Sequence, residues 1–148
     1  MGSNLSGVAV VTGGASGIGL ACCRELAQRG AAIALVDRDQ RAHDVAKEFG
    51  GRAWIVDIAD DDAVERCAAQ IESEFGAPEV LVNSAGIIQV PLPPEQLSMR
   101  VWGDVIRIDQ RGAYAACVAF GKRTAVRRRG SIILKKILAP FIAIEKRG

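Results

Sequence analysis

The chain has 148 residues, of which 49% are hydrophobic and 24% are charged, and its formal net charge at pH 7 is +2. This length predicts one domain with a real core, and the apolar composition excludes a disordered chain. No apolar run reaches the roughly 18 residues that a membrane span needs, and the start lacks a signal-peptide pattern. We therefore expect a soluble, cytoplasmic protein without a membrane partner.

Two compositional features carry no chemistry in this interpretation. The cysteines Cys22, Cys23, Cys67 and Cys117 have neither metal-ligand spacing nor a Cys-x-x-Cys pair, so we predict reduced thiols and no metal site. Charge is uneven: residues 1–110 carry 9 basic and 16 acidic side chains (net −7), and residues 111–148 carry 10 basic and 1 acidic (net +9). The split is compatible with a basic arm or with an end of different origin.

Strands and helices alternate through the first half of the chain. A continuous apolar run marks each expected strand, and a glycine closes each of the first two helices. The expected order is strand 8–12, a glycine-rich turn, helix 19–30, strand 32–37, helix 38–50 and strand 52–57.

The second half continues the same alternation. Three aspartates open the helix at 60–76, where carboxylates suit free amides and the helix dipole. A strand and turn follow at 79–86, a proline-containing loop at 87–94, helices at 100–109 and 112–130, and a fifth strand at 130–134. The arginines at 127–129 end a helix, where cations are favourable, and no aromatic residues are interleaved with them. Nucleic acid is therefore not the expected partner.

Alternating strands and helices, with strands apolar on both faces, predict one parallel sheet covered on both sides. The expected fold class is α/β, a doubly wound, Rossmann-like parallel sheet. Ligands of such sheets gather at the carboxyl ends of the strands.

The glycine-rich turn TGGASGIG (12–19) lies between a strand and a helix, the context of a phosphate-binding loop. Glycines permit a tight turn and let backbone amides approach a pyrophosphate. The candidate phosphate-binding residues are Gly13, Ser16, Gly17, Ile18 and Gly19. The spacing resembles the TGxxxGxG motif of the short-chain dehydrogenase/reductase family.

The residue that ends the second strand predicts the cofactor. Asp37, 18 residues after Gly19, can accept hydrogen bonds from the adenosine ribose hydroxyls and would repel the extra phosphate of NADP. NAD is therefore the expected cofactor, although Arg38 could pair with that phosphate.

Two further segments extend the resemblance over residues 7–133. Asp57 and Ile58 resemble the family's aspartate and apolar neighbour that hold the adenine, with helix capping as the alternative role of Asp57. NSAG (83–86) is similar to the family's NNAG segment, which implies that Asn83 fixes the sheet centre and that Ala85 and Gly86 pass close to the cofactor.

The resemblance implies hydride transfer between nicotinamide and an alcohol or carbonyl carbon, with a serine after the fifth strand and a Tyr-x-x-x-Lys pair. In this sequence no serine follows Ser131, and Val118 stands four residues after the only tyrosine, Tyr114. Asp109 stands where the family usually has a helix asparagine, and it is the one candidate catalytic residue.

The resemblance also implies two further strands. We therefore expect an incomplete NAD-binding domain at 1–133, truncated after the fifth strand, and a divergent basic and apolar tail at 134–148, whose apolar run is a candidate substitute edge strand. A frameshift, an alternative ending and a truncation stay open as origins. The expected function is an NAD(H)-dependent oxidoreductase chain that is inactive alone. The alternative is a non-catalytic NAD-binding or oligomerisation module that depends on a partner chain or a second copy.

Overall fold

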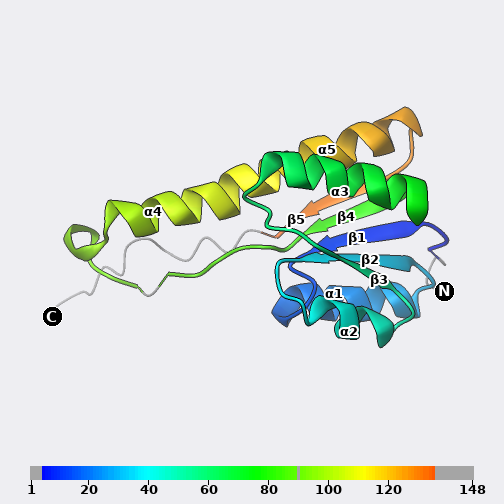
Figure 1. Cartoon of the computed structure of the whole chain (residues 1–148), viewed down its shortest axis with the longest axis horizontal. Helices are drawn as coiled ribbons and strands as arrows, with labels where there is room; N and C mark the ends of the chain where they lie inside the picture. The colour runs from blue at the N-terminus through cyan, green and yellow to red at the C-terminus, as the bar shows by residue number, and fades with distance from the viewer. Residues whose placement is uncertain (1–4, 90, 136–148) are drawn as a thin grey trace, which may run out of the picture.

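The computed structural model describes residues 5–89 and 91–135. Five strands in this part of the chain alternate with helices, and Figure 1 shows them as one layered unit. The elements are β1 (Val8–Thr12), α1 (Gly17–Gln28), β2 (Ala32–Asp37), α2 (Ala42–Lys47), β3 (Arg52–Ile55), α3 (Asp61–Glu74), β4 (Pro78–Asn83), η1 (Pro94–Gln96), α4 (Met99–Val105), η2 (Ile106–Gly112), α5 (Ala113–Val126) and β5 (Ser131–Leu134).

The strands form one parallel sheet in the order β3-β2-β1-β4-β5. Helices α1 and α2 cover one face, and α3 and α5 cover the other (Figure 1). The chain builds outward from β1 to β3 and then crosses back to β4, so the strand order reverses between β1 and β4. This arrangement confirms the predicted doubly wound architecture.

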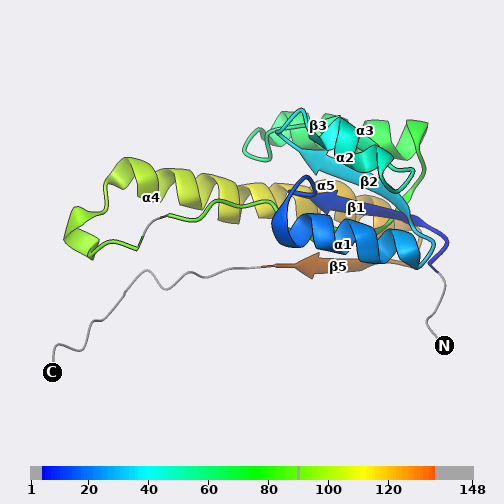
Figure 2. The same ribbon diagram turned by 90° about the horizontal axis from the view of Figure 1, so that it is seen from below.

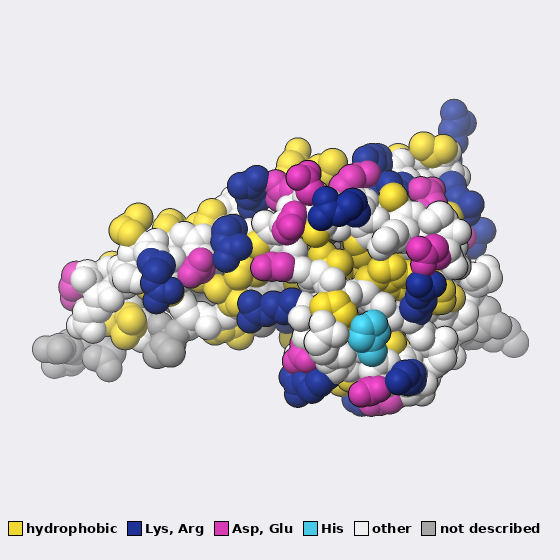
Figure 3. All heavy atoms as spheres, viewed as in Figure 1, with side chains coloured by type: hydrophobic (Ala, Val, Ile, Leu, Met, Phe, Trp, Pro, Cys, Tyr) yellow, Lys and Arg dark blue, Asp and Glu magenta, His cyan; other side chains and the backbone are white. Residues whose placement is uncertain are grey.

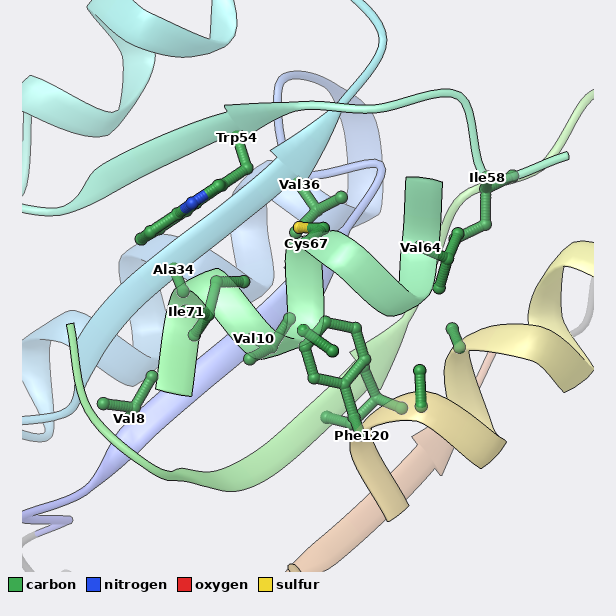
Figure 4. Packing of buried hydrophobic residues seen from close by; sticks show 14 of the residues in the cluster. Val8, Val10, Ala34, Val36, Trp54, Ile58, Val64, Cys67, Ile71 and Phe120 are labelled. Carbon is green, nitrogen blue, oxygen red and sulfur yellow. The ribbon is translucent and has the colours of Figure 1, made fainter. Parts of the chain in front are cut away.

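The two faces of the sheet bury separate apolar clusters because successive side chains of a strand point to opposite faces. Val10 lies in the cluster under α3 and α5, and its neighbour Val11 lies in the cluster under α1. In the first cluster, Phe120 of α5 and Ile71 of α3 are both buried over the strands (Figure 4). Trp54 adds an edge-on contact with Phe75, with ring centroids 5.6 Å apart.

Helix α3 begins as its sequence predicts. The carboxylate of Asp60 accepts a hydrogen bond from the amide of Ala63 at 2.9 Å, so Asp60 is the N-cap, and Asp61 and Asp62 lie in the first turn. Val64, Ala68 and Ile71 are buried along one side of the helix.

Two cations of α5 pair with acids of α3. Lys122 and Arg123 both contact the carboxylate of Glu65, at 2.7 and 3.0 Å, and Arg123 also contacts Glu72 at 3.0 Å. Hydrogen bonds from Lys122 and then Arg123 lower the pKa of Glu65. Figure 3 shows basic and acidic side chains interspersed on the side of the molecule in view.

The two helices expected at 100–109 and 112–130 form one continuous rod. Helix α4 runs into a π-helical segment, η2, and then into α5, which ends at Val126. Gly112 does not break the rod because it has ordinary helical φ and ψ angles of −61° and −41°. A Cβ atom at Gly112 would lie 2.8 Å from the carbonyl oxygen of Ile58, so this glycine permits close approach to the loop after β3. The α4 end of the rod projects beyond the sheet (Figures 1 and 2).

Strand β5 is the edge of the sheet within the described residues, and it pairs with β4 alone (Figure 2). Ile132, Ile133 and Leu134 are each partly exposed, at 41 to 50%. The pairing expected for the tail cannot be compared with the structure beyond Lys135, because residues 136–148, including Lys136, lie outside the described residues.

Replacement of Phe120 by alanine tests this account of the core. Phe120 is 1% exposed, so Phe120→Ala should lower the free energy of unfolding by about 3–5 kcal/mol. Tyr114→Ala on the same helix is the matched control, because Tyr114 is 71% exposed and should change stability by about 0.5 kcal/mol or less. Urea unfolding measures both, and equal losses in the two variants would contradict the packing described here.

Candidate functional site

A pocket of about 340 Å³ opens at the carboxyl ends of the strands. It extends from the ends of β2 and β3, past the glycine-rich turn after β1, to the residues after β4 and β5. Ten of the twelve predicted cofactor-binding residues line it: Gly13, Ser16, Gly17, Ile18, Asp37, Arg38, Asp57, Ile58, Ala85 and Gly86. Segments that are far apart in the sequence therefore meet at one place, as the parallel sheet requires.

The glycines of the turn after β1 have distinct structural roles. Gly13 has a φ angle of +66°, and a Cβ atom there would lie 2.7 Å from the Cα atom of Ala85. Gly19 does not line the pocket; it packs against the carbonyl group of Gly13, where a Cβ atom would collide. Gly17 has a φ angle of +54°, and a Cβ atom there would meet nothing within 4 Å, so the space above it is open.

The start of α1 faces this open space. Ser16 is the N-cap residue, and its side chain makes no capping hydrogen bond. Ser16, Gly17 and Ile18 are exposed and line the pocket. The first amides of an α-helix have no partner within the helix, so this end of the pocket carries a positive helix terminus.

Asp37 supports the turn as well as lining the pocket. Its two carboxylate oxygens accept hydrogen bonds from the backbone amides of Ala15 and Asp39, each at 3.0 Å. The bond to Ala15 joins the end of β2 to the glycine-rich turn, a role that sequence analysis did not identify. Arg38 is exposed beside it, with no ion pair to another described residue.

Asp57 and Ile58 lie at the β3 end of the pocket. The carboxylate of Asp57 accepts a hydrogen bond from the amide of Ala59 at 2.9 Å and is otherwise exposed. Asp57 does not cap α3, because Asp60 occupies that position. Strand β3 ends at Ile55, two residues earlier than predicted, and this turn follows it.

Asn83 lies below the pocket and is 2% exposed. Its amide oxygen accepts a hydrogen bond from the hydroxyl of Thr12 at 2.8 Å, and its amide nitrogen donates to the carbonyl of Ala113 at 2.7 Å. The Thr12 hydroxyl in turn accepts from the amides of Ser84 and Ala85, both at 3.1 Å. Sequence analysis assigned no role to Thr12; a polar residue that ends an otherwise apolar buried strand was the available signal.

Asp109 lies in the π-helical segment η2, against the turn after β4. Its carboxylate accepts a hydrogen bond from the amide of Ile87 at 2.8 Å. A Cβ atom at Gly86 would lie 3.2 Å from the same oxygen, so this glycine lets the carboxylate approach the backbone closely. Burial raises the pKa of Asp109, and the Ile87 amide and the charge of Lys135 act in the opposite direction.

Lys135 lines the pocket beyond β5. Its backbone amide donates to the carbonyl of Asn83 at 3.1 Å, which continues the pairing of β5 with β4 by one residue. Sequence analysis placed Lys135 at the start of the tail at 134–148 and gave it no role in the pocket.

Among the described residues, no group of His, Cys, Asp or Glu is arranged to hold a metal ion. Among the same residues, no helix is both long and apolar enough to cross a membrane.

Comparison with known proteins identifies relatives along most of the chain. A D-threitol dehydrogenase from Mycolicibacterium smegmatis is 37% identical over 145 residues, which cover 94% of this chain and 55% of that protein. A solved structure named as ribose-5-phosphate isomerase from Brucella melitensis 16M is 45% identical, with a TM-score of 0.84, over 88% of this chain and 51% of that one. A 3-ketoacyl-ACP reductase structure from Sinorhizobium meliloti 1021 is 28% identical, with a TM-score of 0.79, over 84% and 51%.

The chain thus spans about half the length of the curated relatives it matches. The family model described as short chain dehydrogenase matches residues 7–135, which include every strand and the whole pocket described above. The protein belongs to the short-chain dehydrogenase/reductase family of oxidoreductases.

Proposed function

We propose that this chain binds NAD(H) as the cofactor-binding part of an oxidoreductase acting on an alcohol or carbonyl substrate. The observation that carries the proposal is the pocket itself, in which the glycine-rich turn, Asp37 and the segment after β4 meet at the point where the strand order reverses. Crevices at such a point bind dinucleotides in open parallel sheets.

The glycine-rich turn fits the pyrophosphate of a dinucleotide. The open space above Gly17 and the unpartnered first amides of α1 together provide room and hydrogen-bond donors for an anion. No side chain at Gly17 obstructs approach to the backbone.

Asp37 supports the choice of NAD over NADP. Each of its oxygens already accepts one backbone amide, which fixes the carboxylate at the pocket wall, and each keeps acceptor capacity for a ribose hydroxyl. The charge of the same carboxylate would repel a phosphate on that ribose. Arg38 is the neighbouring cation that would favour NADP if it dominated.

When bound, NAD(H) supplies the hydride acceptor or donor. The described residues bind and orient the cofactor; a proton acceptor beside the substrate is a separate requirement. Because the sequence contains no Tyr-x-x-x-Lys pair and no serine after Ser131, we propose that this chain alone does not turn over substrate. All four cysteines are free thiols, which supports a reducing, cytoplasmic location.

A second candidate function is a non-catalytic NAD-binding or oligomerisation module. Exposed apolar side chains on the outer side of α5 favour it, among them Tyr114 at 71% and Val118 at 47% exposed. The oligomerisation form of this candidate requires a second copy of the chain, so sedimentation as a monomer at micromolar concentrations would remove that form.

Gly17→Ala tests the phosphate site against a matched control. Gly17 and Gly50 both have positive φ angles, +54° and +66°, and open space where a Cβ atom would lie, but Gly50 is remote from the pocket lining. Both variants should lose about 1 kcal/mol of stability from backbone strain. We expect Gly17→Ala alone to weaken NADH binding, by about tenfold, as measured by fluorescence titration. Equal affinities in the two variants would argue against pyrophosphate at this turn.

Asp37→Asn tests the nucleotide preference. Loss of the charged acceptor should weaken NAD⁺ binding by about tenfold and bring NADP⁺ affinity closer to that for NAD⁺. Asp44→Asn on α2 is the control, because it removes an equal charge from a carboxylate that pairs with Lys47 outside the pocket. Calorimetric titration of both nucleotides gives the ratio. A wild-type chain that prefers NADP⁺ would overturn the assignment of NAD.

Turnover is the third test of the proposal. The chain, incubated with NAD⁺ and D-threitol, should produce no NADH above a protein-free blank, whereas the full-length D-threitol dehydrogenase serves as the positive control. Ribose 5-phosphate is tested in the same panel because one similar structure is named as an isomerase. Its conversion to the ketose is the measured quantity. Product formation that rises in proportion to chain concentration would show that this chain is active by itself.

A further inference from the structure

The position of the pocket fixes where the two halves of a bound dinucleotide must lie. With the adenosine ribose at Asp37 and the pyrophosphate at the turn after β1, the other nucleotide extends across the reversal point toward β4 and β5. The lining there consists of Ser84, Ala85, Gly86, Ile87, Ile108 and Lys135.

One cation belongs to this half of the pocket. The charged lining residues in the described chain are Asp37, Arg38, Asp39, Asp57 and Lys135, and the first four lie at the end of β2 or in the segments after β2 and β3. Lys135 alone follows β5. Its backbone is fixed by the hydrogen bond from its amide to the carbonyl of Asn83, so the side chain begins at a defined point of the pocket wall.

One anion lies behind the same half of the pocket. The carboxylate of Asp109 is held at 2.8 Å from the Ile87 amide and close to Gly86, and both of these residues line the pocket. Asp109 has no ion pair within the described residues, so its charge is not cancelled by a contacting cation. The charge of Lys135 nevertheless acts on Asp109: burial raises the pKa of Asp109, and Lys135 lowers it.

Oxidised and reduced nicotinamide differ by one positive charge on the ring. A nearby cation disfavours the oxidised form, and a nearby anion favours it, whereas both forms share the same adenosine and pyrophosphate contacts. We propose, on the basis of the function proposed above, that Lys135 and Asp109 are opposing charges that set the relative affinity of this pocket for NAD⁺ and NADH. Lys135 favours NADH, and Asp109 favours NAD⁺.

The test is the ratio of the dissociation constants of NAD⁺ and NADH in charge-removing variants. Lys135→Met should lower this ratio about threefold, and Asp109→Asn should raise it about threefold, as expected for one partly screened charge. Asparagine keeps an oxygen that can accept the Ile87 amide. The double variant should return close to the wild-type ratio. NADH is titrated by its fluorescence, and NAD⁺ by competition with NADH.

The ratio distinguishes a charge effect from structural damage. A distorted pocket weakens the binding of both NAD⁺ and NADH, whereas a nearby charge acts on the positively charged ring of NAD⁺. Lys135→Arg keeps the cation and should keep the wild-type ratio, and Lys135→Gln replaces Lys135→Met if that variant does not fold. Lys47→Met and Asp44→Asn make the same charge changes on α2, outside the pocket, and should leave the ratio unchanged.

Opposite shifts in the two single variants would support the inference. Unchanged ratios, or shifts equal to those of the α2 controls, would overturn it while leaving the proposed function intact. If the wild-type chain bound neither nucleotide, the proposed function would fail, and this inference with it.

Discussion

The hydrogen bond between the Thr12 hydroxyl and the Asn83 amide oxygen is the constraint on which the pocket depends. Both groups are buried, and they join the carboxyl ends of β1 and β4, the two strands between which the strand order reverses. Thr12 also accepts the amides of Ser84 and Ala85, and Asn83 donates to Ala113. Loss of either side chain would leave buried partners unsatisfied, at a cost of about 1–3 kcal/mol for each group.

The same network fixes the rod of α4, η2 and α5 against the sheet. Asn83 anchors its α5 part from below through Ala113, and the cations of α5 anchor it to α3 from the side. Exposed ion pairs contribute little individually. Arg123 differs, since its side chain is only 12% exposed and contacts Glu65, Glu72 and the carbonyl of Ala119. The rod is therefore held at its α5 end, and this anchoring positions η2 beside the turn after β4.

Sequence patterns predicted the features that depend on residues close together in the chain, such as strand ends and the glycine-rich turn. Strands β1 and β2 have the predicted bounds because a continuous apolar run is followed at once by a polar residue, Thr12 or Asp37. The glycine-rich turn was predicted from its place between a strand and a helix. The continuity of the rod through Gly112 was not, since a glycine in sequence marks a weak helix position, and its real role is contact with Ile58. The bond from Asp37 to Ala15 and the pocket position of Lys135 likewise depend on segments that meet only in the folded chain.

The two halves of the pocket are therefore built in different ways. At the β2 and β3 end, Asp37 and Asp57 each accept an amide two residues further along the chain, and Asp37 also accepts the amide of Ala15 in the glycine-rich turn; none of these bonds involves the rod. At the β4 end, Asp109 reaches the Ile87 amide from a separate helix, 22 residues away in sequence. A local turn holds its geometry when distant contacts weaken, whereas the position of Asp109 requires the rod to be docked. Perturbing the α3–α5 contacts should thus affect the β4 end of the pocket before it affects the β2 and β3 end.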